Sequence, residues 1–143
     1  MSKPFSCGLL VATPILISGA FSAFQADSRL FARLEMDWEH LYQLADGCPE
    51  FAVELLDLFV QDSTEQLHEL RQAIAQQNYI LAERVAHYLK GASGNVGINA
   101  MYAIAAQLEH QLRQQQWHGA DALVNRLAGL LQDVKALLTP QVA

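Results

Sequence analysis

From Met36 onward, the apolar residues of the chain recur at three- and four-residue spacings, and no segment shows the alternation of a half-buried strand. Short loops separate the periodic segments, so successive helices should pack antiparallel. The chain has 143 residues, of which 52% are hydrophobic, and this is enough apolar surface for one moderate core. We therefore predict an all-α protein, an antiparallel up-down four-helix bundle with a short additional N-terminal helix.

Local start and stop signals give approximate helix boundaries. Proline suits the first turn of a helix that begins near Pro49, and Asn78 and Asn99 are candidate N-caps for the two helices that follow. Pro140 closes the last helix. The predicted helices cover residues 37–45, about 49–76, 79 to near 94–97, 100–116 and about 121–138.

Residues 1–35 form an apolar segment without charge between Lys3 and Asp27, and we do not expect it to be part of the fold. Three interpretations stay open. The segment could be a secretory signal with a short basic start, or a membrane anchor weakened by an internal proline. It could also be a non-native extension, because Met36 opens an amphipathic pattern and could be a second start codon. The predicted domain is residues 36–143.

Charge and motif content exclude several classes of function. The net charge of −6 argues against a nucleic-acid partner, because phosphate binding needs a basic face. Four histidines, His40, His68, His110 and His118, lie on different predicted elements, and no HExxH or His/Cys cluster unites them. A zinc site is therefore not expected, and these four side chains are interpreted as surface histidines.

His87 differs from the other histidines in its surroundings. With about 100° of rotation per residue, it lies roughly 150° from the centre of the apolar face of its helix, so it should face water. That apolar face is predicted to consist of Leu81, Val85, Tyr88, Leu89, Ala92 and Val96. Tyr88, on this face, and Tyr102, on the next predicted helix, are both expected to be core or core-rim aromatics.

Two glycines accompany His87 on its exposed face. Gly91 lies one turn away, inside the helix, where glycine costs about 1 kcal/mol relative to alanine. Gly94 continues this bare strip, Arg84 lies about one turn before the histidine, and Lys90 adds a positive charge. A bare strip allows another protein to approach the ring, and a cation can stabilise an anion joined to it. This combination indicates phosphoryl transfer through histidine.

The stretch "HYLKGASGNVGI" resembles the signature of histidine-containing phosphotransfer (HPt) domains, in which His-x-x-Lys-Gly is followed by serine and a further glycine. His87, Lys90, Gly91, Ser93 and Gly97 all match this pattern. The resemblance extends over about residues 36–138.

The resemblance implies that His87 is the phosphorylated residue, that Lys90 stabilises the phosphoryl group, and that Gly91, with Arg84 and Gly94 around it, belongs to the docking surface. Glu109 matches the position that orients the histidine ring in the family; a solvated carboxylate is the other interpretation. Ser93 is expected to be a structural hydroxyl and Gly97 to allow a helix-terminating turn.

The resemblance further implies a cytoplasmic phosphorelay carrier without a kinase domain, whose partners are receiver domains of response regulators and hybrid histidine kinases. The required metal ion would belong to the receiver, so no cofactor, no metal and no direct small-molecule substrate are expected in this chain. The alternative function is a helical docking or sequestering protein that is not phosphorylated. The N-terminal segment leaves membrane association as a minor alternative.

Overall fold

The computed structural model describes residues 28–139. Over this range the chain is helical, without strands apart from an isolated antiparallel bridge between Met36 and Ile98. The helices are α3 (Ser28–Leu34), α4 (Trp38–Leu44), α5 (Pro49–Ala75), α6 (Tyr79–Val96), α7 (Asn99–Arg113) and α8 (Ala120–Leu138).

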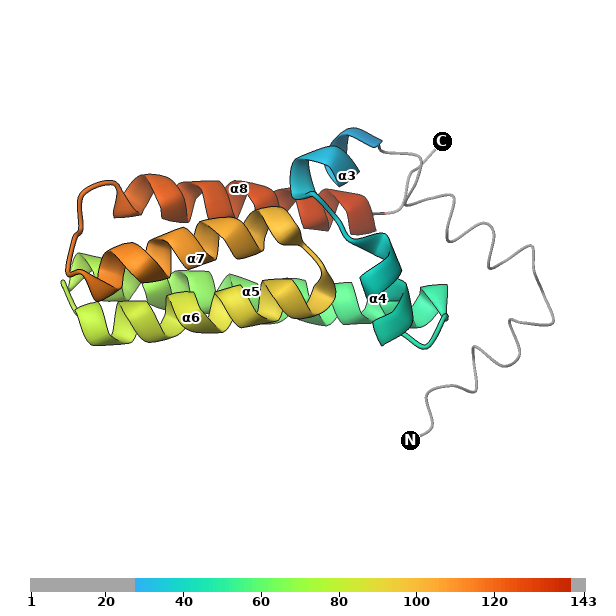
Figure 1. Ribbon diagram of the computed structural model, residues 1–143, viewed down its shortest axis with the longest axis horizontal. Helices are drawn as coiled ribbons and strands as arrows, with labels where there is room; N and C mark the ends of the chain where they lie inside the picture. Colours follow the sequence, from blue (N-terminus) through green and yellow to red (C-terminus); the bar gives the residue numbers. More distant parts are fainter. Residues whose placement is uncertain (1–27, 140–143) are drawn as a thin grey trace.

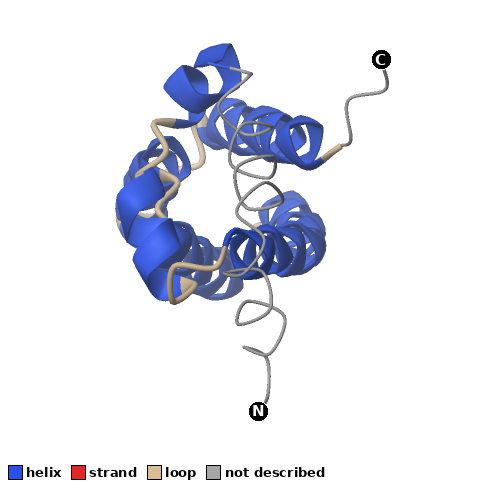
Figure 2. Cartoon of the chain, turned by 90° about the vertical axis from the view of Figure 1, so that its right-hand side faces the viewer, coloured by secondary structure: helices blue, strands red, loops and turns tan. Residues whose placement is uncertain are grey.

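The four long helices form a closed ring in which α5 contacts α6 and α8, and α7 contacts the same two helices. They alternate in direction along a common axis, while α3 and α4 lie at one end of the bundle (Figure 1). Seen along that axis, helices joined by short loops surround the centre of the molecule (Figure 2). The prediction of an all-α up-down bundle is confirmed.

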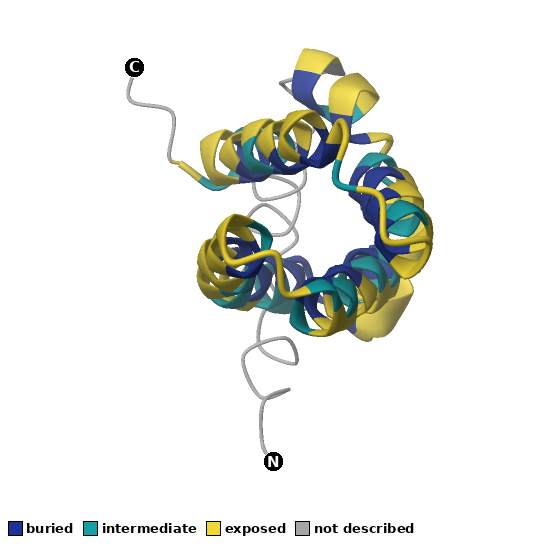
Figure 3. Cartoon of the chain, turned by 90° about the vertical axis from the view of Figure 1, so that its left-hand side faces the viewer, coloured by how far each residue is buried: buried dark blue, intermediate teal, exposed yellow. Residues whose placement is uncertain are grey.

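Leucine, valine and alanine side chains fill the interior. The buried positions face the axis of the bundle and the exposed positions face outward (Figure 3). Among the fully buried side chains are Leu56 on α5, Leu89 on α6, Leu108 on α7 and Leu127 on α8. Each long helix therefore contributes to one shared core, as the helical periodicity of the sequence requires.

Side-chain and glycine caps set several of the helix ends. Oδ1 of Asn78 accepts a hydrogen bond from the backbone N–H of Leu81 at 3.1 Å, so Asn78 caps α6 as predicted. Gly97 ends α6 in the left-handed conformation, with φ of +80°. The predicted cap at Asn99 was wrong, because Ile98 occupies the N-cap position of α7 without a side-chain bond, and α7 ends at Arg113 instead of residue 116.

Two aromatic residues depart from the predicted apolar face. Tyr88 is 46% exposed and Tyr102 is 44% exposed, so their assignment to the core or its rim was wrong. The hydroxyl of Tyr88 donates a hydrogen bond to Oδ2 of Asp62 on α5. Because a phenol keeps a polar partner for its hydroxyl, Tyr88 lies across the outside of the α5–α6 contact.

The segment before Met36 is partly integrated in the fold. Leu30 and Leu34 on α3 are buried in the common core, and α3 packs against α7 and α8. The backbone carbonyl of Glu35 accepts a hydrogen bond from the N–H of Asn99 at 3.3 Å. The predicted boundary at residue 36 was therefore wrong for residues 28–35, because the leucines of α3 cover an apolar face that α7 and α8 leave open.

Residues 1–27 lie outside the described residues, and with them the three interpretations of the apolar segment. Between residues 28 and 139, none of the helices combines the length and the apolar character that crossing a membrane requires.

Candidate functional site

The His87 side chain lies on the outer face of α6 and is 67% exposed. Its Nδ1 is 2.7 Å from Oε2 of Glu109 on α7. Since a carboxylate only accepts hydrogen bonds, this contact places the ring proton on Nδ1. Within residues 28–139 the ring makes no other hydrogen bond, so Nε2 keeps its lone pair on an open side of the ring.

Glu109 is almost completely buried, at 3% exposure. Its Oε1 lies 2.7 Å from Nζ of Lys90, and its Oε2 accepts from Nη2 of Arg113 at 2.8 Å as well as from His87. The interpretation of Glu109 as a solvated carboxylate was therefore wrong. Burial alone would raise the pKa of Glu109, but the hydrogen bonds from Lys90 and His87 outweigh it, and the pKa lies below its ordinary value.

Lys90 lies one turn after His87 and its side chain is only 26% exposed. We expected a cation on the exposed face beside the histidine; the structure instead directs the ammonium group to Oε1 of Glu109. The positive charge thus lies beside the histidine and is already paired with a buried carboxylate.

Arg113 and Glu83 complete the cluster, and sequence reasoning missed both roles. The guanidinium of Arg113 donates from Nε to Oε2 of Glu83 at 2.9 Å while Nη2 contacts Glu109. The hydrogen bond to Glu83 is the main reason why the pKa of Arg113 is raised. The available signal was spacing, because Glu109 and Arg113 lie four residues apart on α7, as Glu83 and His87 do on α6.

An open groove runs beside His87 along α6. The residues that line it are His40, His87, Tyr88, Gly91, Ala92, Gly94 and Asn95. A Cβ at Gly91 would meet nothing within 4 Å, so this position is bare toward solvent. A Cβ at Gly94 would be 3.0 Å from Cδ2 of Tyr102, so Gly94 makes room for that ring as well as lining the groove.

The other predicted residues of the motif have separate places. Arg84 is exposed on α6 but does not line the groove. Ser93 is buried, and its Oγ donates to the backbone carbonyl of Leu89 at 2.7 Å, so the hydroxyl faces the helix backbone and not the His87 ring. His40, expected to be a simple surface histidine, borders the groove with Nε2 2.9 Å from the carbonyl of Asn95.

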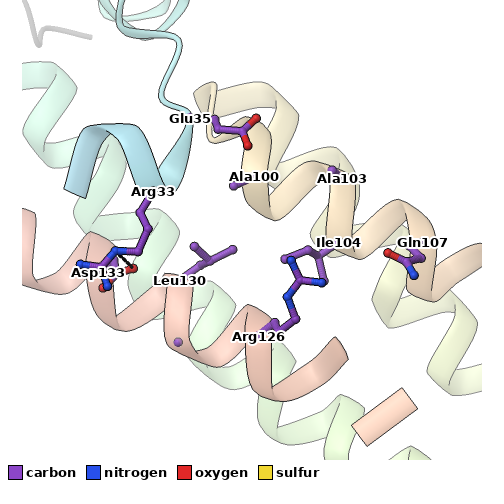
Figure 4. A pocket seen from close by; sticks show the side chains of 10 residues that line it. Arg33, Glu35, Ala100, Ala103, Ile104, Gln107, Arg126, Leu130 and Asp133 are labelled. Atoms are coloured by element: carbon purple, nitrogen blue, oxygen red, sulfur yellow. Dashed lines mark ion pairs between the residues drawn. The ribbon is translucent and has the colours of Figure 1, made fainter. Parts of the chain in front are cut away.

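A second hollow lies between α3, α7 and α8 and shares no residue with the groove beside His87. Figure 4 shows two arginines, Arg33 and Arg126, at its edges, with Nε of Arg33 3.6 Å from Oδ2 of Asp133. Small or aliphatic residues make up half of its lining and charged or polar residues the other half, and none of them is a serine, threonine, cysteine, histidine or lysine. In the described part of the chain, no cluster of three or more His, Cys, Asp or Glu side chains could hold a metal ion.

Comparison with known proteins gives consistent matches. The family model described as "Hpt domain" matches residues 54–137. The phosphorelay intermediate protein rdeA of Dictyostelium discoideum is 24% identical over 105 residues, which are 73% of this chain and 41% of that protein. The chain thus spans less than half the length of that relative.

Two solved structures share the fold. Histidine-containing phosphotransfer protein B (HptB) from Pseudomonas aeruginosa PAO1 superposes with a TM-score of 0.67 at 28% identity, covering 72% of this chain and 90% of that one. The HPT domain of a sensor hybrid histidine kinase from Shewanella superposes with a TM-score of 0.61 at 19% identity, covering 74% and 92%. At 19% identity the second likeness concerns the fold alone.

Proposed function

The chain belongs to the Hpt domain family, and on that basis we propose that it is a phosphorelay intermediate that carries a phosphoryl group on His87. The phosphoryl group would come from the aspartyl phosphate of one receiver domain and go to the aspartate of another. One observation carries this proposal: His87 is held at Nδ1 by a buried carboxylate, while Nε2 is open on an exposed helix face.

The contact with Glu109 suits Nε2 for nucleophilic attack. A proton fixed on Nδ1 leaves the lone pair on Nε2. When Nε2 bonds to phosphorus, the bond from phosphorus to the aspartyl oxygen breaks, and the electron pair leaves with the receiver's carboxylate. The ring keeps its Nδ1 proton and becomes positively charged, and the adjacent Glu109 carboxylate stabilises that charge. Return transfer reverses these steps.

The surroundings of His87 fit the approach of a receiver domain. Gly91 presents no side chain beside the ring, and Gly94 continues the groove on the same helix. Arg84 lies on the same helix and is exposed, so we assign it to the periphery of the docking surface. Lys90 would turn from the Glu109 carboxylate toward the phosphoryl oxygens, because the phosphoryl group carries two negative charges and the carboxylate only one.

The chemistry divides between this chain and its partners. The aspartate and the divalent metal ion needed for transfer would be supplied by the receiver, so this chain would act as a carrier without kinase activity or a cofactor of its own. Receiver domains of response regulators and hybrid histidine kinases are the proposed partners, and the cytoplasm, where they take up phosphoryl groups, is the proposed location.

The decisive experiment is label transfer from a phosphorylated receiver domain to the purified chain. We expect uptake of an acid-labile, alkali-stable label, as a phosphoramidate is, and no uptake by His87→Gln. His68→Gln is the matched control, since His68 is an exposed histidine on α5. Equal uptake by His87→Gln would overturn the assignment. Stable binding of the receiver without any uptake by the unmodified chain would favour the sequestering function instead.

A further inference from the structure

Two cations share the buried carboxylate of Glu109, and they differ in how they are held. Lys90 reaches Oε1 through a single ammonium contact, and it lies on the same helix as His87, three residues further on. Arg113 contacts Oε2, the oxygen that also holds Nδ1 of His87, and it is fixed a second time through Glu83.

This asymmetry has a consequence once His87 carries a phosphoryl group. When Lys90 turns toward the phosphoryl oxygens, its ammonium group is drawn away from Oε1 of Glu109, because the phosphoryl group would lie on the exposed side of the ring while Glu109 is buried. A buried carboxylate that loses its cationic partners favours the protonated form. The nearest available proton is the one on Nδ1 of His87, which lies 2.7 Å away.

We propose that Arg113, anchored by Glu83, is a positioning residue that keeps Glu109 ionised and directed at Nδ1 of His87 while Lys90 moves to the phosphoryl group. Lys90 is then the exchangeable cation and Arg113 the permanent one. This inference rests on the proposed function and names a residue that acts on His87 through Glu109, without touching the phosphoryl group itself.

Retention of the Nδ1 proton matters for onward transfer. In phosphorylated His87 with Nδ1 protonated, the ring is a cation, and cleavage of the bond between nitrogen and phosphorus releases a neutral imidazole. If Glu109 took that proton, cleavage would have to expel an imidazole anion, which is a far poorer leaving group. Arg113 therefore favours release of the phosphoryl group to the next receiver, because it keeps the proton on the ring.

The protonation of His87 can be measured without any phosphoryl transfer. In Lys90→Gln, Arg113 is the remaining cation at Glu109, and ¹⁵N NMR of the His87 ring at mildly alkaline pH should still show a proton on Nδ1. In the double variant Lys90→Gln/Arg113→Gln, Glu109 should take up a proton from solvent and donate it in a hydrogen bond to Nδ1. The ring would then carry its own proton on Nε2 in a substantial fraction of molecules. Lys90→Gln/Arg71→Gln is the matched control, since Arg71 bonds to Asn125 on a different pair of helices.

The phosphorylated state gives the second readout. Phosphoramidate, a chemical donor, is used to phosphorylate the unmodified chain and Arg113→Gln, and transfer to a receiver domain is then followed. We expect the Nδ1 resonance of Arg113→Gln to become that of an unprotonated nitrogen, and onward transfer to slow by about tenfold, as for loss of one charge-assisted hydrogen bond. Arg113→Lys should recover part of the rate, since it restores the charge without the bridge to Glu83.

The outcomes separate this inference from the proposed function. If both double variants keep the Nδ1 proton, or if Arg113→Gln transfers the phosphoryl group at the rate of the unmodified chain, Arg113 has no positioning role. If no receiver phosphorylates the unmodified chain, the proposed function is wrong, while the tautomer measurement in the Lys90→Gln background still decides the role of Arg113. Thermal unfolding of each variant checks that the bundle is intact.

Discussion

The ring of Tyr102 on α7 packs against Gly94 on α6 so closely that a Cβ at position 94 would be 3.0 Å from Cδ2 of the ring. Three residues earlier, a Cβ at Gly91 would meet nothing within 4 Å. The sequence places both glycines on the same face of α6. In the fold, the space beside Gly91 is open, whereas the space beside Gly94 is filled by the Tyr102 ring. The difference gives a direct test of which glycine serves a partner.

Gly91→Ala should raise the free energy of unfolding by about 0.5–1 kcal/mol, since alanine has the higher helix propensity and the site is open. Gly94→Ala should gain less than Gly91→Ala, because the Tyr102 ring has to shift to admit the new methyl group. Urea unfolding of both variants measures the difference. Equal gains would show that the ring gives way without cost.

Gly91→Gln should leave the fold intact and slow phosphoryl transfer between a receiver domain and His87 by roughly 10- to 100-fold, since misplacing reacting groups by about 1 Å costs rates of this order. Gly129→Gln is the matched control, because Gly129 lies within α8 and a Cβ there also meets nothing within 4 Å. Quenched-flow transfer assays compare the two. If both variants transfer at the rate of the unmodified chain, Gly91 is not part of the docking surface.

Glu109 should make the stability of the bundle depend on acid pH. Its pKa is lower in the folded state than its ordinary value of 4.5, so its contribution is fully present above about that pH. The contribution is lost as the pH falls through the folded pKa, because protonation breaks the contacts with Lys90 and His87. Urea unfolding from neutral to acid pH should show a steeper decline for the unmodified chain than for Glu109→Gln.

Glu65→Gln is the control for this pH series, since Glu65 is exposed on α5 and has no cationic partner within residues 28–139. It should follow the unmodified chain closely. A Glu109→Gln profile that parallels the unmodified chain throughout would mean that Glu109 is not stabilised as an anion by the fold.

Gly97→Ala should destabilise the protein by about 1–3 kcal/mol, because φ of +80° strains any residue with a Cβ. The added Cβ would also be 2.8 Å from the backbone oxygen of Asp37, the residue that precedes α4. Gly119→Ala separates the two causes, since Gly119 has φ of +82° and open space around it. Thermal unfolding should rank Gly97→Ala below Gly119→Ala; equal losses would assign the whole effect to backbone strain.

Leu34→Ala should lower the free energy of unfolding by about 2–5 kcal/mol, as for other fully buried leucines, because the Leu34 side chain is completely enclosed. Ala32→Ser, exposed on the same helix, should change it by less than about 0.5 kcal/mol. Denaturant unfolding of the full chain compares them. A negligible effect of Leu34→Ala would mean that α3 does not stabilise the bundle, as first expected from the sequence.

The start of α6 and the exposure of His87 were predictable because both depend on neighbours along the chain. Asn78 caps α6, and helical rotation alone places His87 opposite Leu89, which is fully buried. The helix α3 was not predicted, because it has only a few apolar residues, Leu30 and Leu34 among them, and so short a pattern does not indicate a helix. Its packing against the bundle is visible only in the tertiary structure.

Tyr88 shows where helical rotation becomes ambiguous. It lies at the edge of the apolar arc, where the tilt of a neighbouring helix decides between core and solvent, and Asp62 on α5 provides the partner that holds its hydroxyl outside. The same limit applies to Gly94, whose neighbour Tyr102 comes from the next helix.

The sequence by itself determined a helical bundle, the cap of α6 at Asn78, and an exposed histidine beside a lysine and a glycine, since each follows from spacing along the chain. Only the tertiary structure decided that Glu109 is buried and that Lys90 and His87 of α6 converge on it. The physical reason is that desolvation and pairing of a carboxylate depend on how α6 and α7 pack together, and residues 22 positions apart in the chain meet only through that packing.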